Sequence, residues 1–156
     1  MSTPMTIFGK NLLDTELERL LKVDREEIKV EIAEARAHGD LKENAEYHAA
    51  KEKQSHIEGR IGELQAKLGS AKVVDPTNAQ HDKIVFGATV TVVHIENDET
   101  TTFQIVGEDE AMTSSEKISF SSPLGKSLIG KEEGDEVIVK APKGDIEYSV
   151  EQVEYK

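Results

Sequence analysis

The stretch YHAAKEKQSHIEGRIGELQAKLGSA, residues 47–71, decides the fold of the first half of the chain. Apolar residues recur in it in alternating steps of three and four, and only Gln54 interrupts them: Tyr47, Ala50, Gln54, Ile57, Ile61, Leu64, Leu68 and Ala71. This heptad spacing predicts a long helix that packs against a second helix along one seam. The helix is expected to end near residues 69–72.

A weaker helical pattern precedes this stretch. From Asp14 onward, apolar residues fall on one side of a helix at spacings of three, four and seven: Leu17, Leu20, Leu21, Ile28, Ile32 and Ala35. Asn11 or Asp14 is expected to cap its start, and Gly39 to end it, because glycine adopts the left-handed conformation that ends many helices. Because only a short turn separates the two patterns, they predict an antiparallel coiled-coil hairpin with its tip near residues 39–44.

Small residues mark the seam near the turn, whereas Leu and Ile mark it near the base. The small residues are Ala35, Ala45, Ala49 and Ala50. Small side chains allow two helices to approach closely, so we expect a slender tip that buries little apolar area. Such a tip suits insertion into a narrow space, although an ordinary hairpin with a frayed end fits the same pattern.

Runs rich in Val, Ile and Thr dominate the second half and predict strands at residues 88–95, 100–105, 117–120, 136–141 and 147–154. Turn signals separate these runs, and residues 123–129 predict one short helix. The sequence therefore predicts an α+β fold, with a helical hairpin over residues 1–76 and an antiparallel sheet domain over residues 80–156. The boundary is placed at Asp75–Gln80, where a turn-forming sequence coincides with an acidic shift in composition.

Composition excludes several classes of function. The 156 residues carry a net charge of −12, which argues against binding duplex nucleic acid through a broad basic face. Cys is absent, so disulfides and thiolate metal sites are excluded. No apolar run approaches the ~20 residues needed to span a bilayer, and the start lacks the features of a signal peptide. A cytoplasmic protein is therefore expected, and a monomer, because no pattern indicates an oligomer.

Two carboxylates, Asp40 and Glu43, lie in the turn between the predicted helices. Asp-x-x-Glu at a helix start is typical of a capping box, in which Asp40 accepts a hydrogen bond from the backbone near Glu43. The same carboxylates are ligands of the type that Mg²⁺ prefers, and the two roles are compatible. Two carboxylates do not form a tight Mg²⁺ site alone, so a partner would have to supply further ligands.

The turn and its flanks, residues 32–36 and 38–52, resemble the hairpin tip of the GreA/GreB transcript-cleavage factors. The resemblance continues in the right order through nearly the whole chain, at residues 58–61, 84–90, 105–107, 110–111, 122–124 and 128–131. The weak basic patch that Arg36, Lys42, Lys51 and Lys53 could form, together with the acidic net charge, resembles GreA more than the more basic GreB. The resemblance implies that the second domain is similar to FK506-binding proteins and docks on bacterial RNA polymerase beside the mouth of its secondary channel.

For the tip, the resemblance implies that the hairpin enters the secondary channel of a backtracked polymerase. Asp40 and Glu43 would hold a second Mg²⁺, shared with the polymerase, and orient the attacking water. The extruded RNA 3′ end would then be hydrolysed by two-metal chemistry. The factor would not itself be an enzyme, because it supplies only half of the metal site.

Further tip residues are expected to assist the acidic pair. Arg36 and Lys51 are expected to contact the RNA 3′ segment, with a solvated face of mixed charge as the alternative. Lys51 stands where the family pattern has Arg, so the charge is kept but the paired hydrogen bonding of a guanidinium is lost. Gly39, Asn44 and Tyr47 are expected to support the tip, and Tyr47 either packs the hairpin end, which we favour, or stacks on a base.

Two other functions fit parts of the sequence. A regulator of the same fold could occupy the channel without promoting cleavage, although it would not need both Asp40 and Glu43. A prolyl isomerase would need an aromatic-lined pocket, whereas the aromatic residues of the second domain are more easily explained as core: Phe86, Phe103, Phe120, Tyr148 and Tyr155. Transcript cleavage is therefore the favoured hypothesis.

Overall fold

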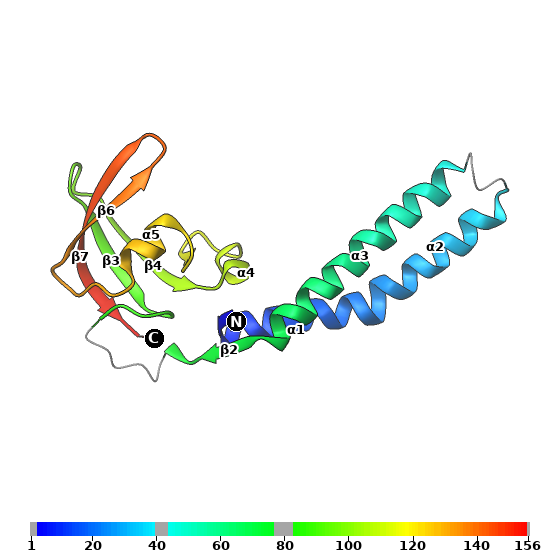
Figure 1. Cartoon of the computed structure of the whole chain (residues 1–156), viewed down its shortest axis with the longest axis horizontal. Helices are drawn as coiled ribbons and strands as arrows, with labels where there is room; N and C mark the ends of the chain where they lie inside the picture. Colours follow the sequence, from blue (N-terminus) through cyan, green and yellow to red (C-terminus); the bar gives the residue numbers. More distant parts are fainter. Residues whose placement is uncertain (1–2, 40–43, 77–82, 156) are drawn as a thin grey trace. The chain divides into compact units, whose positions relative to one another are not determined.

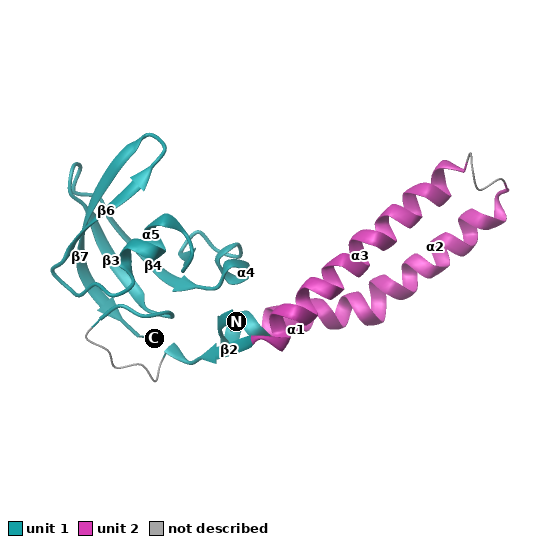
Figure 2. Cartoon of the chain, in the orientation of Figure 1, with its two compact units in different colours: residues 1–10, 71–156 teal, residues 11–70 magenta. Residues whose placement is uncertain are grey.

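The computed structural model describes residues 3–39, 44–76 and 83–155. The chain divides into two compact units (Figure 2). The hairpin unit comprises residues 11–70, and the sheet unit comprises residues 1–10 and 71–156. The predicted α+β fold, a helical hairpin followed by a sheet, is confirmed. The boundary predicted at residues 76–80 falls largely on residues outside those described and stays a prediction.

The first helical run begins earlier than expected. It consists of α1 (Ile7–Arg19), a π-helical turn η1 (Leu20–Asp24) and α2 (Arg25–Ala37). The caps expected at Asn11 or Asp14 are therefore wrong. Thr6 performs this role, because its Oγ1 accepts a hydrogen bond from the Gly9 N–H at 3.0 Å.

The π-helical turn keeps the apolar stripe of this run in phase. Leu20 and Ile28 are both buried, at 8% and 1% exposure. In a regular α-helix their spacing would turn them about 80° apart, because each residue advances about 100°. A π turn accommodates roughly one extra residue, which brings Ile28 back to the side of Leu20. The sequence pattern alone did not show this correction.

The second helix, α3 (Ala45–Gly69), confirms the predicted seam. Its inward side buries Ala50, Ile57, Ile61 and Leu64, and the remaining helical members of the seam are half-buried: Tyr47, Gln54 and Leu68. Ala71 instead begins a strand. Helices α2 and α3 run antiparallel and side by side (Figure 1).

The small-residue seam near the turn is only half as extensive as expected. Ala35 and Ala50 are buried, at 4% and 6% exposure. Ala45 and Ala49 are exposed, so their assignment to the seam is wrong. They lie off the face that Ala50 and Ile57 define on α3.

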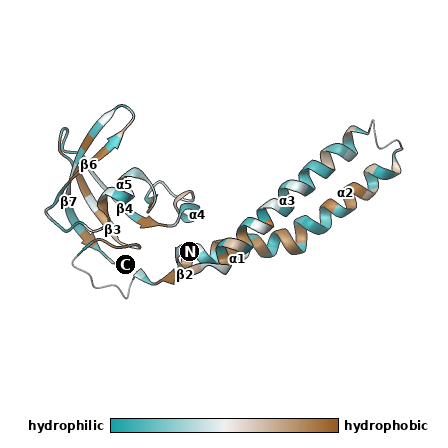
Figure 3. Cartoon of the chain, in the orientation of Figure 1, coloured by the Kyte–Doolittle hydropathy of each residue, from teal (hydrophilic) through white to brown (hydrophobic). Residues whose placement is uncertain are grey.

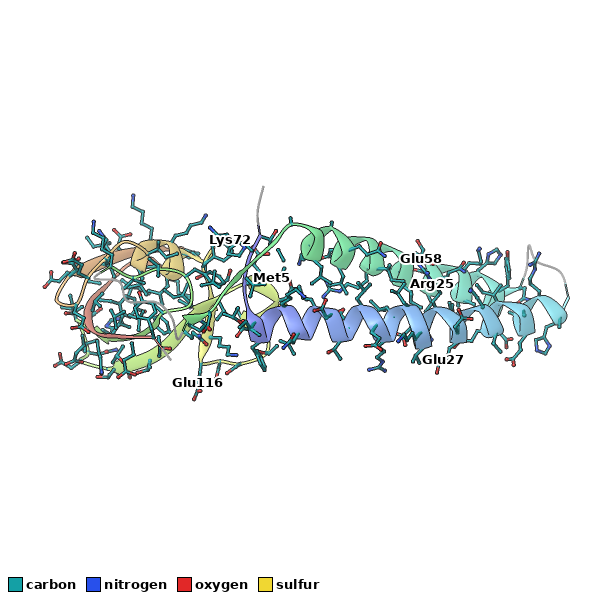
Figure 4. The ribbon with its side chains drawn as sticks, turned by 90° about the horizontal axis from the view of Figure 1, so that it is seen from below. Met5, Arg25, Glu27, Glu58, Lys72 and Glu116 are labelled. Carbon is teal, nitrogen blue, oxygen red and sulfur yellow. The ribbon has the colours of Figure 1, made fainter. Side chains whose placement is uncertain are left out.

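Ion pairs join the two helical runs of the hairpin along its length. Arg60 binds Glu16 with both Nε and Nη2, at 2.7 and 2.8 Å. Arg25 Nη2 lies 2.8 Å from Glu58 Oε2, as the adjoining side chains in Figure 4 show. Lys53 Nζ lies 3.2 Å from Glu31 Oε1, nearer the turn. These pairs fix the register between the two runs in addition to the apolar seam.

The sheet unit contains two sheets. Strand β1 (Thr3–Thr6) pairs in parallel with β2 (Ala71–Val74), a pairing that was not predicted. The larger sheet has the order β5-β4-β3-β7-β6, with β3 (Thr89–His94), β4 (Thr100–Val106), β5 (Lys117–Ser119), β6 (Glu136–Ala141) and β7 (Gly144–Glu154). All five correspond to predicted strands.

The larger sheet is mixed rather than antiparallel, because β4 and β5 run parallel. A parallel pair needs a crossover connection. Helix α4 (Glu108–Ala111) lies in that connection, and α5 (Pro123–Leu128) follows β5, so residues 83–155 contain two short helices where one was predicted.

The core of the sheet unit lies among its strands and α5. Its buried members include Val90, Val92, Ile105, Leu128 and Val150. In Figure 3, hydrophobic residues, drawn in brown, lie along the strands of this sheet. The predicted core aromatics are found here: Phe103 is buried, Phe120, Tyr148 and Tyr155 pack against the cluster, and the Phe86 ring meets Phe120 edge-on at 5.6 Å. No helix in the described part of the chain has the length and apolar character needed to cross a membrane.

Among the described residues of the sheet unit, one charged side chain is buried. Glu110 is 3% exposed, and its carboxylate accepts hydrogen bonds from the Thr6 hydroxyl and from Lys117 Nζ, the latter at 2.8 Å. The Lys117 ammonium also lies 4.1 Å from the centre of the Phe8 ring. This cluster attaches the first turn of α1 to α4 and β5 within the unit.

Candidate functional site at the hairpin tip

Helix α2 ends as the sequence predicted. The His38 N–H donates to the Ala35 carbonyl at 3.2 Å, and the Gly39 N–H donates to the Arg36 carbonyl at 3.5 Å. Gly39 has φ +121°, a conformation that side-chain-bearing residues rarely adopt. Glycine at this position therefore lets the chain leave the helix and enter residues 40–43.

Helix α3 begins at Ala45 and is capped by Asn44. Asn44 Oδ1 accepts a hydrogen bond from the Tyr47 N–H at 3.0 Å. Asn44 Nδ2 also donates to the Ala35 carbonyl at 2.5 Å, across the hairpin. Asn44 therefore occupies the N-cap of α3, and the capping box expected at Asp40 and Glu43 stays a prediction. Asp40 and Glu43 lie outside the described residues.

The basic residues expected to meet RNA lie on the exposed surface of the hairpin. Arg36 is exposed on the last turn of α2. Lys51 is exposed on α3, where its ammonium donates to Gln54 at 3.1 Å. Lys53, which belongs to the same stretch, is engaged by Glu31 across the hairpin. The RNA-contacting role of Arg36 and Lys51 stays a prediction.

Tyr47 is half-buried in the first turn of α3. Its ring meets the His48 ring edge-on, with 5.7 Å between centroids and 65° between planes. The phenol ring is thus partly packed and partly accessible, which leaves both expected roles, packing and stacking, as predictions.

An open groove of about 380 Å³ lies between α2 and α3 behind the tip. Three glutamates and three alanines make up most of its lining: Glu31, Glu34, Ala35, His38, Glu46, Ala49, Ala50 and Lys53. The sequence alone did not reveal this groove, although the i, i+3 spacing of Glu31 and Glu34 was a usable signal. Glu34 and Glu46 add negative potential near the tip, which favours a cation there.

A shared Mg²⁺ at the tip stays a prediction, because Asp40 and Glu43 lie outside the described residues. Carboxylate oxygens are the ligands that Mg²⁺ prefers, and Asp40 and Glu43 supply them. Within residues 3–39, 44–76 and 83–155, no three His, Asp or Glu side chains gather in a group that could hold a metal ion. His38 and His48 accordingly join no such group.

Family models match both halves of the chain. The model for the N-terminal domain of GreA/GreB transcription elongation factors matches residues 3–73, and the model for their C-terminal domain matches residues 79–155. The chain belongs to the GreA/GreB family of transcription elongation factors. The family resemblance expected from the sequence is thus confirmed.

Relatives similar to this GreA/GreB-family chain cover nearly its full length. A protein of Ruthia magnifica named transcription elongation factor GreA is 57% identical over 153 residues, covering 97% of both chains. A protein of Francisella philomiragia with the same name is 54% identical over 154 residues, covering 98% of this chain and 96% of its own. Among solved structures, GreA factor homolog 1 of Thermus thermophilus is 27% identical with a TM-score of 0.46, covering 98% of this chain and 99% of its own.

Proposed function

We propose that this factor binds bacterial RNA polymerase through the secondary channel and stimulates the polymerase to cleave the 3′ end of backtracked nascent RNA. Membership of the transcription elongation factor family and relatives named GreA at up to 57% identity support the proposal. The observation that carries it is the acidic pair's place in the connection between two long antiparallel helices. We expect the factor to act in the cytoplasm as a monomer.

In this proposal, the acidic and the basic residues of the tip have different roles. Asp40 and Glu43 would hold a Mg²⁺ ion jointly with the polymerase and orient the attacking water. The ion, when bound, would supply a Lewis acid for hydrolysis of the phosphodiester. Arg36 and Lys51 would place positive charge beside the RNA backbone, which is negative. The factor would not be an enzyme by itself, because two carboxylates leave most of the coordination to the partner.

The proposal is tested with a stalled, backtracked polymerase complex carrying 3′-labelled RNA. The wild-type factor should release a short labelled fragment faster than the complex does alone. Asp40→Asn and Glu43→Gln should each lower this cleavage rate by about 10–100-fold. That is the loss of activity typical when a group that orients a metal ligand is removed. Both substitutions keep side-chain size, so binding to the polymerase should stay close to wild type.

Three results would count against the proposal. A wild-type factor that binds the complex without accelerating release would instead support a regulator that only occupies the channel. A factor that does not bind polymerase would remove the proposed partner. Normal cleavage by both variants would show that the carboxylates are not needed.

A further inference from the structure

Asn44 makes a contact that its role as a helix cap does not require. As the N-cap of α3, it needs only a side-chain oxygen that accepts from the Tyr47 N–H, and the bond to Oδ1 at 3.0 Å provides this. Ser and Asp serve about equally well at such positions. The bond from Nδ2 to the Ala35 carbonyl at 2.5 Å is additional. An ionised Asp has no donor for it, and the Ser hydroxyl, carried on Cβ, is one bond shorter than the Asn amide.

The acceptor of this bond is already satisfied without Asn44. The Ala35 carbonyl receives the His38 N–H at 3.2 Å, as expected in the last turn of α2. The Asn44 amide therefore fills no unpaired buried group. Its effect is to connect the last turn of α2 to the first residue before α3, across the hairpin.

Few other contacts can hold these two helix ends together. The fully buried part of the seam here consists of Ala35 and Ala50, whose small side chains bury little apolar area, and Tyr47 beside them is only half-buried. The ion pair between Lys53 and Glu31 lies farther along both helices from the turn. The amide of Asn44 is thus the polar cross-link closest to residues 40–43 among the described contacts of α2 and α3.

We propose that Asn44 is a positioning residue, whose side-chain amide fixes the separation of the helix ends that flank the acidic pair. This inference rests on the proposed function, because it concerns how Asp40 and Glu43 are presented to the polymerase. Misplacing a reacting group by about 1 Å can cost about a hundredfold in rate. A change that removes the donor but keeps the cap should therefore impair cleavage without unfolding the hairpin.

The kinetic test compares Asn44→Asp and Asn44→Ser with the wild type. Both keep an oxygen for the Tyr47 N–H. Asp loses the donor to Ala35 and adds a charge, whereas Ser is uncharged and keeps only a hydroxyl one bond shorter than the Asn amide. At saturating factor, both should lower the cleavage rate about tenfold or more. The factor concentration that gives half of the maximal rate should not change, whereas a general loss of structure would change it. Asn97→Asp is the control, because Asn97 Oδ1 accepts from the Glu99 N–H in a turn and keeps that role as Asp.

A second measurement needs neither a variant nor polymerase. In the free wild-type protein, nuclear magnetic resonance should show one Asn44 side-chain amide proton that exchanges with solvent more slowly than those of Asn97. Equally rapid exchange at both residues would overturn the inference, as would wild-type cleavage rates in both Asn44 variants. A wild-type factor that fails to stimulate cleavage, with a protected Asn44 amide, would instead overturn the proposed function and leave the cross-link in place.

Discussion

Glu110 illustrates how this acidic chain accommodates a buried charge. Its carboxylate is almost fully removed from solvent and is satisfied by the Thr6 hydroxyl and the Lys117 ammonium. A Cβ added at Gly9 would lie 2.8 Å from Glu110 Oε1, so the glycine gives the carboxylate its space. Removing one partner of such a pair is costly because the other charge loses its compensation.

Glu110→Ala should therefore destabilise the sheet unit, by about 3 kcal/mol. The free energy of unfolding in urea, measured on the full chain, checks this value. Glu116→Ala is the control, because Glu116 is exposed in the same connection and should change the free energy by less than about 0.5 kcal/mol. Equal losses for the two variants would show that burial of Glu110 contributes nothing specific.

At the residue scale, the sequence predicted which kinds of interaction occur better than it predicted which residues make them. It predicted a polar cap before α3 but considered Asp40, whereas Asn44 occupies the position. Asp and Asn have similar capping preferences, so the sequence cannot choose between them without the tertiary contact to Ala35. The end of α2 at Gly39 was predictable, because the backbone there requires a positive φ.

At the element scale, ion pairs within α3 add to those that join the two helical runs of the hairpin. Near the base, Arg60 and Lys67 both contact Glu63, at 3.1 and 3.3 Å. The hydrogen bond from Lys67, followed by that from Arg60, holds the pKa of the Glu63 carboxyl below its ordinary value of 4.5. A pKa lowered by folding means that Glu63 stabilises the fold when it is ionised.

The contribution of Glu63 should be present above its ordinary pKa of 4.5 and should disappear as the pH falls through its lower, folded-state pKa. Glu63→Gln should therefore lower the melting temperature at about pH 7 and have much less effect at about pH 3. Thermal unfolding followed by circular dichroism measures both. Glu27→Gln, at an exposed position of α2, is the matched control. A Glu63→Gln effect that is the same at both pH values would contradict this account.

Whole elements were predictable where one periodic signal decided them. The heptad spacing found α3, and alternating Val, Ile and Thr found the strands of the larger sheet. The early start of α1 was missed because its cap, Thr6, also ends strand β1. The parallel alignment of β5 with β4 was missed because alternation predicts a strand but does not specify its neighbour.

At the scale of the whole molecule, the chain carries a net charge of −12, and we propose that it acts next to RNA. Such a charge opposes tight binding to nucleic acid alone, so the polymerase would have to provide most of the binding energy. Electrostatics also favours a cation at the tip, where Glu34 and Glu46 lie near the ends of α2 and α3. The acidic pair itself was found from sequence and family resemblance, and its metal-holding role remains a proposal.

The most direct test of that role is the Mg²⁺ dependence of factor-stimulated cleavage. With saturating factor and a backtracked complex, the Mg²⁺ concentration for half of the maximal rate is measured for the wild type and for Asp40→Asn. If Asp40 holds the shared ion, the variant should need a markedly higher Mg²⁺ concentration, and excess Mg²⁺ should restore part of its rate. An identical Mg²⁺ dependence for the two proteins would contradict the claim that the hairpin tip completes a metal site of the polymerase.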